Sequence, residues 1–164
     1  MQIIDKNEIE SLILLMGKKI EAPKETIYYE KFEFEGQNKY RYLNLFDFNS
    51  TKHIPEEERD TFFEISRIIS KNNFTMDLEG MCMLNIANYP HVSISNLIEK
   101  LNPKYITLWG VEPEKINLKI KLYGGALIDK VKVIRLDNLE KTSLDITSRN
   151  TAETLLKMMF GLSK

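Results

Sequence analysis

The sequence is poor in the residues that bind metals, form disulfides or cradle phosphates. It contains one cysteine, Cys82, and two histidines, His53 and His91, among 164 residues. A single cysteine excludes a disulfide within the chain, and no two of these three residues have the spacing of a zinc site. The seven glycines form neither GxGxxG nor the P-loop pattern, which excludes the common phosphate-binding loops. We therefore expect neither a metal ion nor a cofactor.

The chain also lacks an excess of either charge and lacks long apolar runs. It has 23 basic and 24 acidic residues, for a net charge of −1. A domain that holds the nucleic-acid backbone usually carries a basic excess, so we expect no strong direct nucleic-acid binding. Charges begin at Asp5, too early for a signal-peptide core, and no apolar run approaches membrane-spanning length. Together with the single cysteine, this predicts a cytoplasmic protein without a membrane segment.

The N-terminal part differs in pattern from the rest of the chain. We predict an amphipathic helix and a charged tether over residues 1–39, followed by one α/β domain over residues 40–164. The helix is expected from Asn7, an N-cap residue type, to Met16 before Gly17. Its apolar side chains recur at i, i+3, i+4 and i+7 and form one stripe, namely Ile9, Leu12, Ile13 and Met16. The tether either adds an edge strand or becomes ordered only on contact with another surface.

From Tyr40 onward, strand and helix patterns alternate. We expect strands over residues 40–46, 81–86, 105–109, 118–122 and 131–136, and helices that begin near Pro55, near Ser93 or Ser95, and near Asn150. The helix after Pro55 should bury Phe62, Ile65, Ile68 and Ile69. The continuous apolar run over 81–86 is typical of a buried parallel strand. The pattern therefore predicts a three-layer α/β/α sandwich with a mostly parallel sheet of four or five strands.

Polar residues gather where the predicted strands end, which is where open α/β sheets bind ligands. The candidates for a pocket are Asp47, Asn85, Asn88, His91 and Glu112. Asp47 and His91 could act as an acid–base pair, or they could be ordinary turn and loop residues. An open pocket with convergent polar groups would favour an enzyme. Filling of this region by the aromatic residues Phe48, Tyr89 and Trp109 would instead favour a docking protein.

Three surfaces could bind a partner. The stripe of the first helix either folds back onto the body or lies in a partner's groove. Trp109 either anchors a partner or fills the core, since tryptophan is common in both settings. A homodimer is a third alternative, in which Ile27, Tyr29, Phe32 and Phe34 pair along an exposed edge.

Two families share features with the body. Met83-Leu84-Asn85 and Ile106-Thr107-Leu108-Trp109-Gly110 resemble two strand motifs of uracil-DNA glycosylases, and the resemblance implies that Asn85 would read the uracil edge. The water-activating loop of that family, Gly-Gln-Asp-Pro-Tyr-His, is replaced here by Phe46-Asp47-Phe48-Asn49-Ser50. The later His-Pro-Ser loop is replaced by Arg135-Leu136-Asp137-Asn138. The resemblance therefore implies a similar fold without the catalytic set.

A second resemblance covers residues 62–162. The chain looks like small Bacteroidetes-type proteins similar to the psi subunit of DNA polymerase III, on the segments Leu84-Asn85-Ile86-Ala87, Leu108-Trp109-Gly110-Val111-Glu112-Pro113 and Leu156-Lys157-Met158-Met159-Phe160-Gly161-Leu162. This resemblance implies a glycosylase-like fold with no catalytic residues, in a subunit that bridges a clamp-loader ATPase and a chi-like protein. The helix stripe would then dock into the clamp loader. The competing hypothesis is a nucleobase-binding or hydrolytic domain of the glycosylase superfamily.

Overall fold

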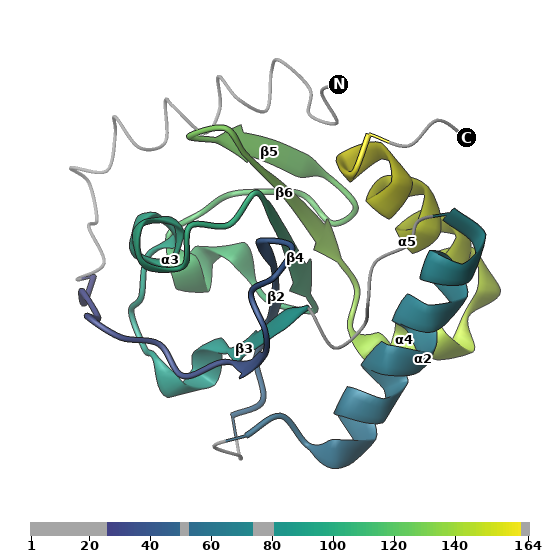
Figure 1. Ribbon diagram of the computed structural model, residues 1–164, viewed down its shortest axis with the longest axis horizontal. Coiled ribbons are helices and arrows are strands. Elements are labelled where there is room, and N and C mark those ends of the chain that lie inside the picture. Colours follow the sequence, from purple (N-terminus) through teal and green to yellow (C-terminus); the bar gives the residue numbers. More distant parts are fainter. Residues whose placement is uncertain (1–25, 50–52, 74–80, 162–164) are drawn as a thin grey trace.

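The computed structural model describes residues 26–49, 53–73 and 81–161, and its centre is a six-stranded sheet in the order β1-β3-β2-β4-β6-β5 (Figure 1). Four strands are parallel: β2 (Tyr42–Phe46), β3 (Cys82–Asn85), β4 (Tyr105–Trp109) and β6 (Val131–Leu136). The edge strands β1 (Glu35–Gly36) and β5 (Gly125–Ile128) run antiparallel to their neighbours. The predicted α/β class is confirmed, but the sheet is mixed and has six strands.

The antiparallel edge at β5 corrects two predictions. Residues 118–122, where a strand was predicted, contain none, and β5 begins instead at Gly125 and runs antiparallel, whereas a mostly parallel sheet was predicted. The turn between β5 and β6 consists of Asp129 and Lys130, both with positive φ (48° and 69°). Two successive residues with positive φ form the hairpin turn that matches strand twist, and asparagine and glycine usually occupy it. Asp129-Lys130 lacks the asparagine or glycine of this pattern, which is why no hairpin was predicted here.

Helices cover both faces of the sheet (Figure 1). On one face lie α2 (Glu56–Asn73), α4 (Leu139–Leu144) and α5 (Ile146–Met159). On the other lies α3 (Ile94–Leu101), and two short 3-10 helices follow β3 and β4, namely η3 (Ile86–Asn88) and η4 (Pro113–Ile116). The predicted helix near Asn150 therefore begins earlier, at Ile146, and a separate helix, α4, precedes it. None of the helices in the described ranges is both long and apolar enough to cross a bilayer.

Successive side chains of each strand point to opposite faces of the sheet, so the protein has one hydrophobic core on each face. On β2, Leu43 and Leu45 point to the α3 side, whereas Tyr42 and Phe46 point to the side of α2 and α5. Phe62 packs into the second core, as the stripe of its helix predicted. The side chains of Ile68 and Ile69 lie outside the described residues, as does the whole predicted helix with Ile9, Leu12, Ile13 and Met16.

The described part of the N-terminal segment crosses the surface beside α3. We call residues 26–34 the strap. It contains no strand, yet its backbone is held by side chains of the body, because Asn96 accepts a hydrogen bond from the N–H of Tyr29 (2.7 Å) and donates one to its carbonyl (3.0 Å). The rings of Tyr29 and Phe32 pack edge-on against Tyr89. The buried side-chain amide of Asn96 thus satisfies the two backbone groups of Tyr29 that a neighbouring strand would satisfy in a sheet.

Candidate functional site

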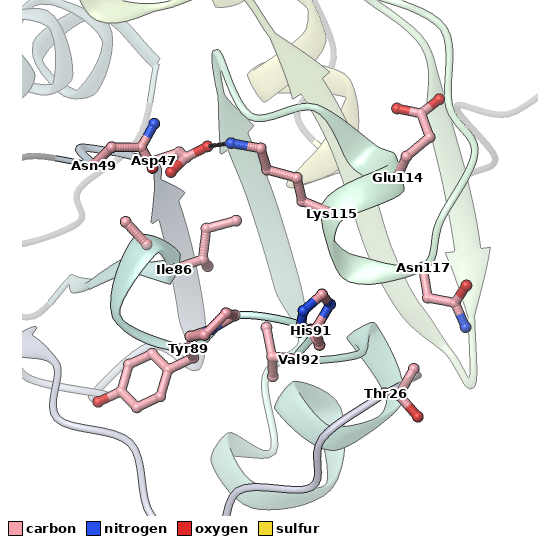
Figure 2. Close-up of a pocket in the computed structure, with 12 residues that line it drawn as sticks. Thr26, Asp47, Asn49, Ile86, Tyr89, His91, Val92, Glu114, Lys115 and Asn117 are labelled. Carbon is pink, nitrogen blue, oxygen red and sulfur yellow. Dashed lines mark hydrogen bonds and ion pairs between the residues drawn. The ribbon is translucent and has the colours of Figure 1, made fainter. Parts of the chain in front are cut away.

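A cavity of about 440 Å³ opens at the carboxyl ends of β2, β3 and β4 (Figure 2). The residues after β2 supply Asp47 and Asn49, the η3 loop supplies the apolar floor, and η4 supplies Lys115. The full lining is Thr26, Asp47, Asn49, Ile86, Ala87, Tyr89, Pro90, His91, Val92, Glu114, Lys115 and Asn117. Its place agrees with the rule for open α/β sheets, and its volume is within the roughly 300–1,000 Å³ typical of small-molecule sites.

Asp47 and His91 both line this cavity, but they are not paired with each other. The carboxylate of Asp47 forms an ion pair with the ammonium of Lys115. Figure 2 shows this pair on one side of the cavity and the His91 ring on the opposite side. The Asp47 side chain is only 10% exposed, so the ion pair forms a closed side of the cavity. This geometry orients a charge pair toward the cavity and provides no His–Asp relay for proton transfer.

The conformation of His91 is set by the strap. Its backbone is left-handed (φ 65°), an uncommon state for a residue with a side chain. The His91 carbonyl accepts a hydrogen bond from the N–H of Ile27 (2.8 Å), and the neighbouring Pro90 carbonyl accepts one from the hydroxyl of Tyr29 (2.9 Å). Two contacts from one strap thus hold the loop that carries the His91 ring.

Asn85 and Asn88 do not line the main cavity. They line a separate hollow of about 110 Å³, beside Glu33, Glu35 and His53. The side-chain oxygen of Asn85 accepts hydrogen bonds from the N–H groups of Phe48 (2.9 Å) and Ala87 (3.3 Å). Its amide nitrogen donates to the carbonyl of Phe48 (3.2 Å). Asn85 is 4% exposed, so its amide fixes the loop after β2.

Glu112 and Trp109 also lie apart from the cavity. Glu112 is on the surface, where its 65%-exposed carboxylate lies 3.4 Å from Arg135. Trp109 is 3% exposed, and its indole N–H donates to the side-chain oxygen of Asn44 (2.9 Å) inside the core. Of its two predicted settings, the structure places Trp109 in the core, which corrects its assignment as a partner-binding residue.

The aromatic side chains do not fill the strand-end region. Phe48 stacks on Phe46 at 5.8 Å between ring centroids and packs against the second core. Tyr89 forms part of the cavity wall, and its ring turns toward the strap, where its hydroxyl accepts a hydrogen bond from the N–H of Glu33 (2.7 Å). The cavity is therefore open, which was the feature expected of an enzyme and not of a docking protein, but its polar groups do not converge, because Asp47 is paired with Lys115 on one side and His91 lies on the other.

Several lining residues were missed from the sequence. Lys115 is the clearest case, because a lysine in a charged loop gives no sign that it faces a carboxylate 68 positions earlier. The one signal that could have identified Lys115 is its place two residues after Pro113, in the segment that follows β4, because such segments line ligand sites in open α/β sheets. Thr26 was missed because only tertiary contacts bring the strap to the cavity.

The single cysteine belongs to the core. Cys82 is fully buried on β3, and burial raises the pKa of its thiol to about 12. Because the thiolate is the reactive form, such a thiol is a poor nucleophile. In the described ranges, no group of three or more histidine, cysteine or acidic residues is placed to hold a metal ion.

Comparison with known proteins adds no further assignment. A scan against protein-family models found no matching family, and a search of curated proteins found no significant match.

Proposed function

We propose that the chain is a non-catalytic protein-interaction subunit, similar to the psi subunit of the DNA polymerase III clamp-loader complex. The observation that carries the proposal is the engagement of Asn85. In a glycosylase this position would read a base, whereas here both ends of its amide bind the backbone of Phe48. The side-chain oxygen of Asn85 already accepts from two backbone N–H groups, so reading a base edge through that oxygen would compete with the bonds that hold the loop after β2.

The separation of Asp47 from His91 supports the same proposal. Asp47 forms an ion pair with Lys115, and the His91 ring lies on the other side of the cavity from this pair. The mixed α/β sheet is compatible with the fold that the resemblance implies. In this role, the stripe of the first helix would bury its apolar side chains in a clamp-loader subunit, while the body would contact a second, chi-like protein.

Substitutions in the stripe are expected to abolish recovery of clamp-loader proteins from the native cytosol. Leu12→Ser with Met16→Ser removes two of the four stripe side chains, and deletion of residues 1–19 removes them all. The full-length chain and a Leu14→Ser control, which alters an apolar residue outside the stripe, should recover the same replication proteins. Affinity capture with mass spectrometry measures this. If the truncated chain recovers the clamp loader as well as the full chain does, the psi-like role is wrong.

A second candidate function follows from the open cavity, namely binding of a nucleobase or nucleotide. A screen of nucleobases, nucleosides and nucleotides by thermal shift would test it, with the full-length chain. A true ligand should raise the melting temperature, and this rise should be lost in Asp47→Asn and in His91→Ala. Asn88→Ala, in the separate hollow, should keep it. A rise that is equal in all four proteins would exclude the cavity as the site.

A further inference from the structure

The two most exposed large apolar side chains among the described residues are neighbours. Leu144 is 78% exposed and Ile146 is 61% exposed, whereas the other exposed ones lie between 37% and 49%. They flank Asp145 where α4 ends and α5 begins. We call these three residues the α4–α5 corner. Single exposed apolar residues are common, whereas these two lie two positions apart and form one small apolar patch, the kind of surface feature that interfaces enlarge.

The corner is held in a fixed conformation. The N–H of Asp145 closes α4 by donating to the carbonyl of Lys141 (2.9 Å), and its carboxylate begins α5 by accepting from the N–H of Thr147 (3.2 Å) and the hydroxyl of Ser148 (2.8 Å). These bonds lower the pKa of the Asp145 carboxyl. Arg149 also donates to the carbonyl of Ser143. The backbone that carries the two apolar side chains is therefore already ordered, so covering it costs little backbone entropy.

Acidic side chains lie next to the corner. Glu140 is four residues before Leu144 on α4, so the two side chains share one side of the helix. α4 packs against α2, which begins with Glu56, Glu57 and Glu58. Burial raises the pKa of Glu58, and the nearby carboxylates of Glu140 and Glu57 raise it further. Glu57 and Glu140 thus both repel the charge of Glu58, and we call these three residues the acidic group. No cation of the described chain forms an ion pair with them.

We propose that the α4–α5 corner and the acidic group form a docking surface for a partner protein whose contacting segment carries apolar and basic side chains. Apolar contact at Leu144 and Ile146 would supply affinity, and the acids would select cations and speed encounter. A second copy of this chain fits poorly, because it would bring the same acids against each other. The inference deepens the proposed function by giving the body its own partner surface, and it rests on that function only in requiring a protein partner.

Two labelled amphipathic helical peptides test the surface, using the full-length chain. Both have the same leucine face, and the opposite face carries lysines in one and glutamates in the other. Fluorescence anisotropy should show that the glutamate peptide binds at least about tenfold more weakly than the lysine peptide. Leu144→Ser with Ile146→Ser should weaken lysine-peptide binding by about tenfold or more. Glu57→Gln with Glu140→Gln should weaken it and flatten its salt dependence.

The matched control is Leu122→Ser with Leu127→Ser, which removes two exposed leucines near β5 and should leave peptide binding unchanged. Circular dichroism checks that each variant is folded. The proposal is overturned if the lysine peptide fails to bind, if both peptides bind equally, or if a folded corner variant binds as tightly as the original. Sedimentation that shows a dimer, lost in the corner variant, would assign the corner to a second copy and also overturn it. Because the stripe is unchanged in every protein used, these outcomes are independent of the clamp-loader capture.

Discussion

Replacement of Phe62 by alanine is expected to lower the free energy of unfolding by about 3–5 kcal/mol, the usual cost of truncating a buried phenylalanine. Phe62 is 1% exposed and joins α2 to the sheet. Its ring meets Phe46 at 5.5 Å and Trp109 at 5.9 Å between centroids, both nearly edge-on. Few other atoms can move into the space that truncation leaves, because the strands are fixed by their neighbours. Since a domain is stable by only about 5–15 kcal/mol, most of the margin would be lost.

Equilibrium unfolding in urea measures this loss as a shift in the midpoint at unchanged slope. Phe63 is the matched control: it is adjacent in sequence and only partly buried, so Phe63→Ala should cost clearly less. If Phe62→Ala is too unstable to purify, Phe62→Leu and Phe63→Leu can be compared instead. Both losses should be smaller, and the loss at Phe62 should still be the larger one. Equal losses at the two positions would contradict the assignment of Phe62 to the second core.

Strands with continuous apolar and β-branched runs were predictable from the sequence. The bounds of β4 and β6 match the predicted ranges 105–109 and 131–136, and α2 begins directly after Pro55 as its start signals indicated. These elements were found because local pattern and tertiary burial agree. The edge strand β5 was misplaced because its turn, Asp129-Lys130, takes positive φ without the glycine or asparagine that normally announces it.

The position of the cavity was predictable, whereas its internal contacts were not. The strand-end rule selected the loops that carry Asp47 and His91, and both line the cavity. The partner that each of these two residues contacts depends on interactions that no local pattern encodes. His91 takes its place through the hydrogen bond from Ile27, and Asp47 turns to Lys115 on η4. Each contact joins residues more than sixty positions apart, so sequence spacing carries no information about it.

Buried asparagines are the least predictable part of the structure, and they organise much of it. Asn96 holds the strap, Asn85 holds the loop after β2, and Asn44 binds Trp109 within the core. In sequence each looks like a polar residue within or beside an apolar run. A buried amide must have its hydrogen bonds satisfied, so each one specifies a particular neighbour. Asn85 and Asn96 explain why the loop after β2 and the strap take fixed positions without regular secondary structure of their own.

Asn44 and Trp109 are expected to be energetically coupled. Asn44 is fully buried in the middle of β2, accepts the indole N–H of Trp109 and lies near the carbonyl of Cys82 (3.3 Å). Asn44→Ala leaves the indole N–H without an acceptor, which should cost about 1–3 kcal/mol in addition to the lost packing. Trp109→Phe removes the donor and strands the Asn44 oxygen in the same way. The double variant removes both partners, so its loss should be smaller than the sum of the single losses.

Urea unfolding of the four proteins in this cycle should give a coupling energy of about 0.5–3 kcal/mol. Trp109→Phe combined with Leu97→Ala is the control, because Leu97 lies in the core on the opposite face of the sheet. That pair should be additive to within about 0.5 kcal/mol. Additivity of the Asn44 and Trp109 losses would mean that the hydrogen bond adds no coupling. Coupling would show that a polar contact between the two neighbouring strands β2 and β4 helps to fix their register, since sliding either strand by one residue would turn one partner to the other face.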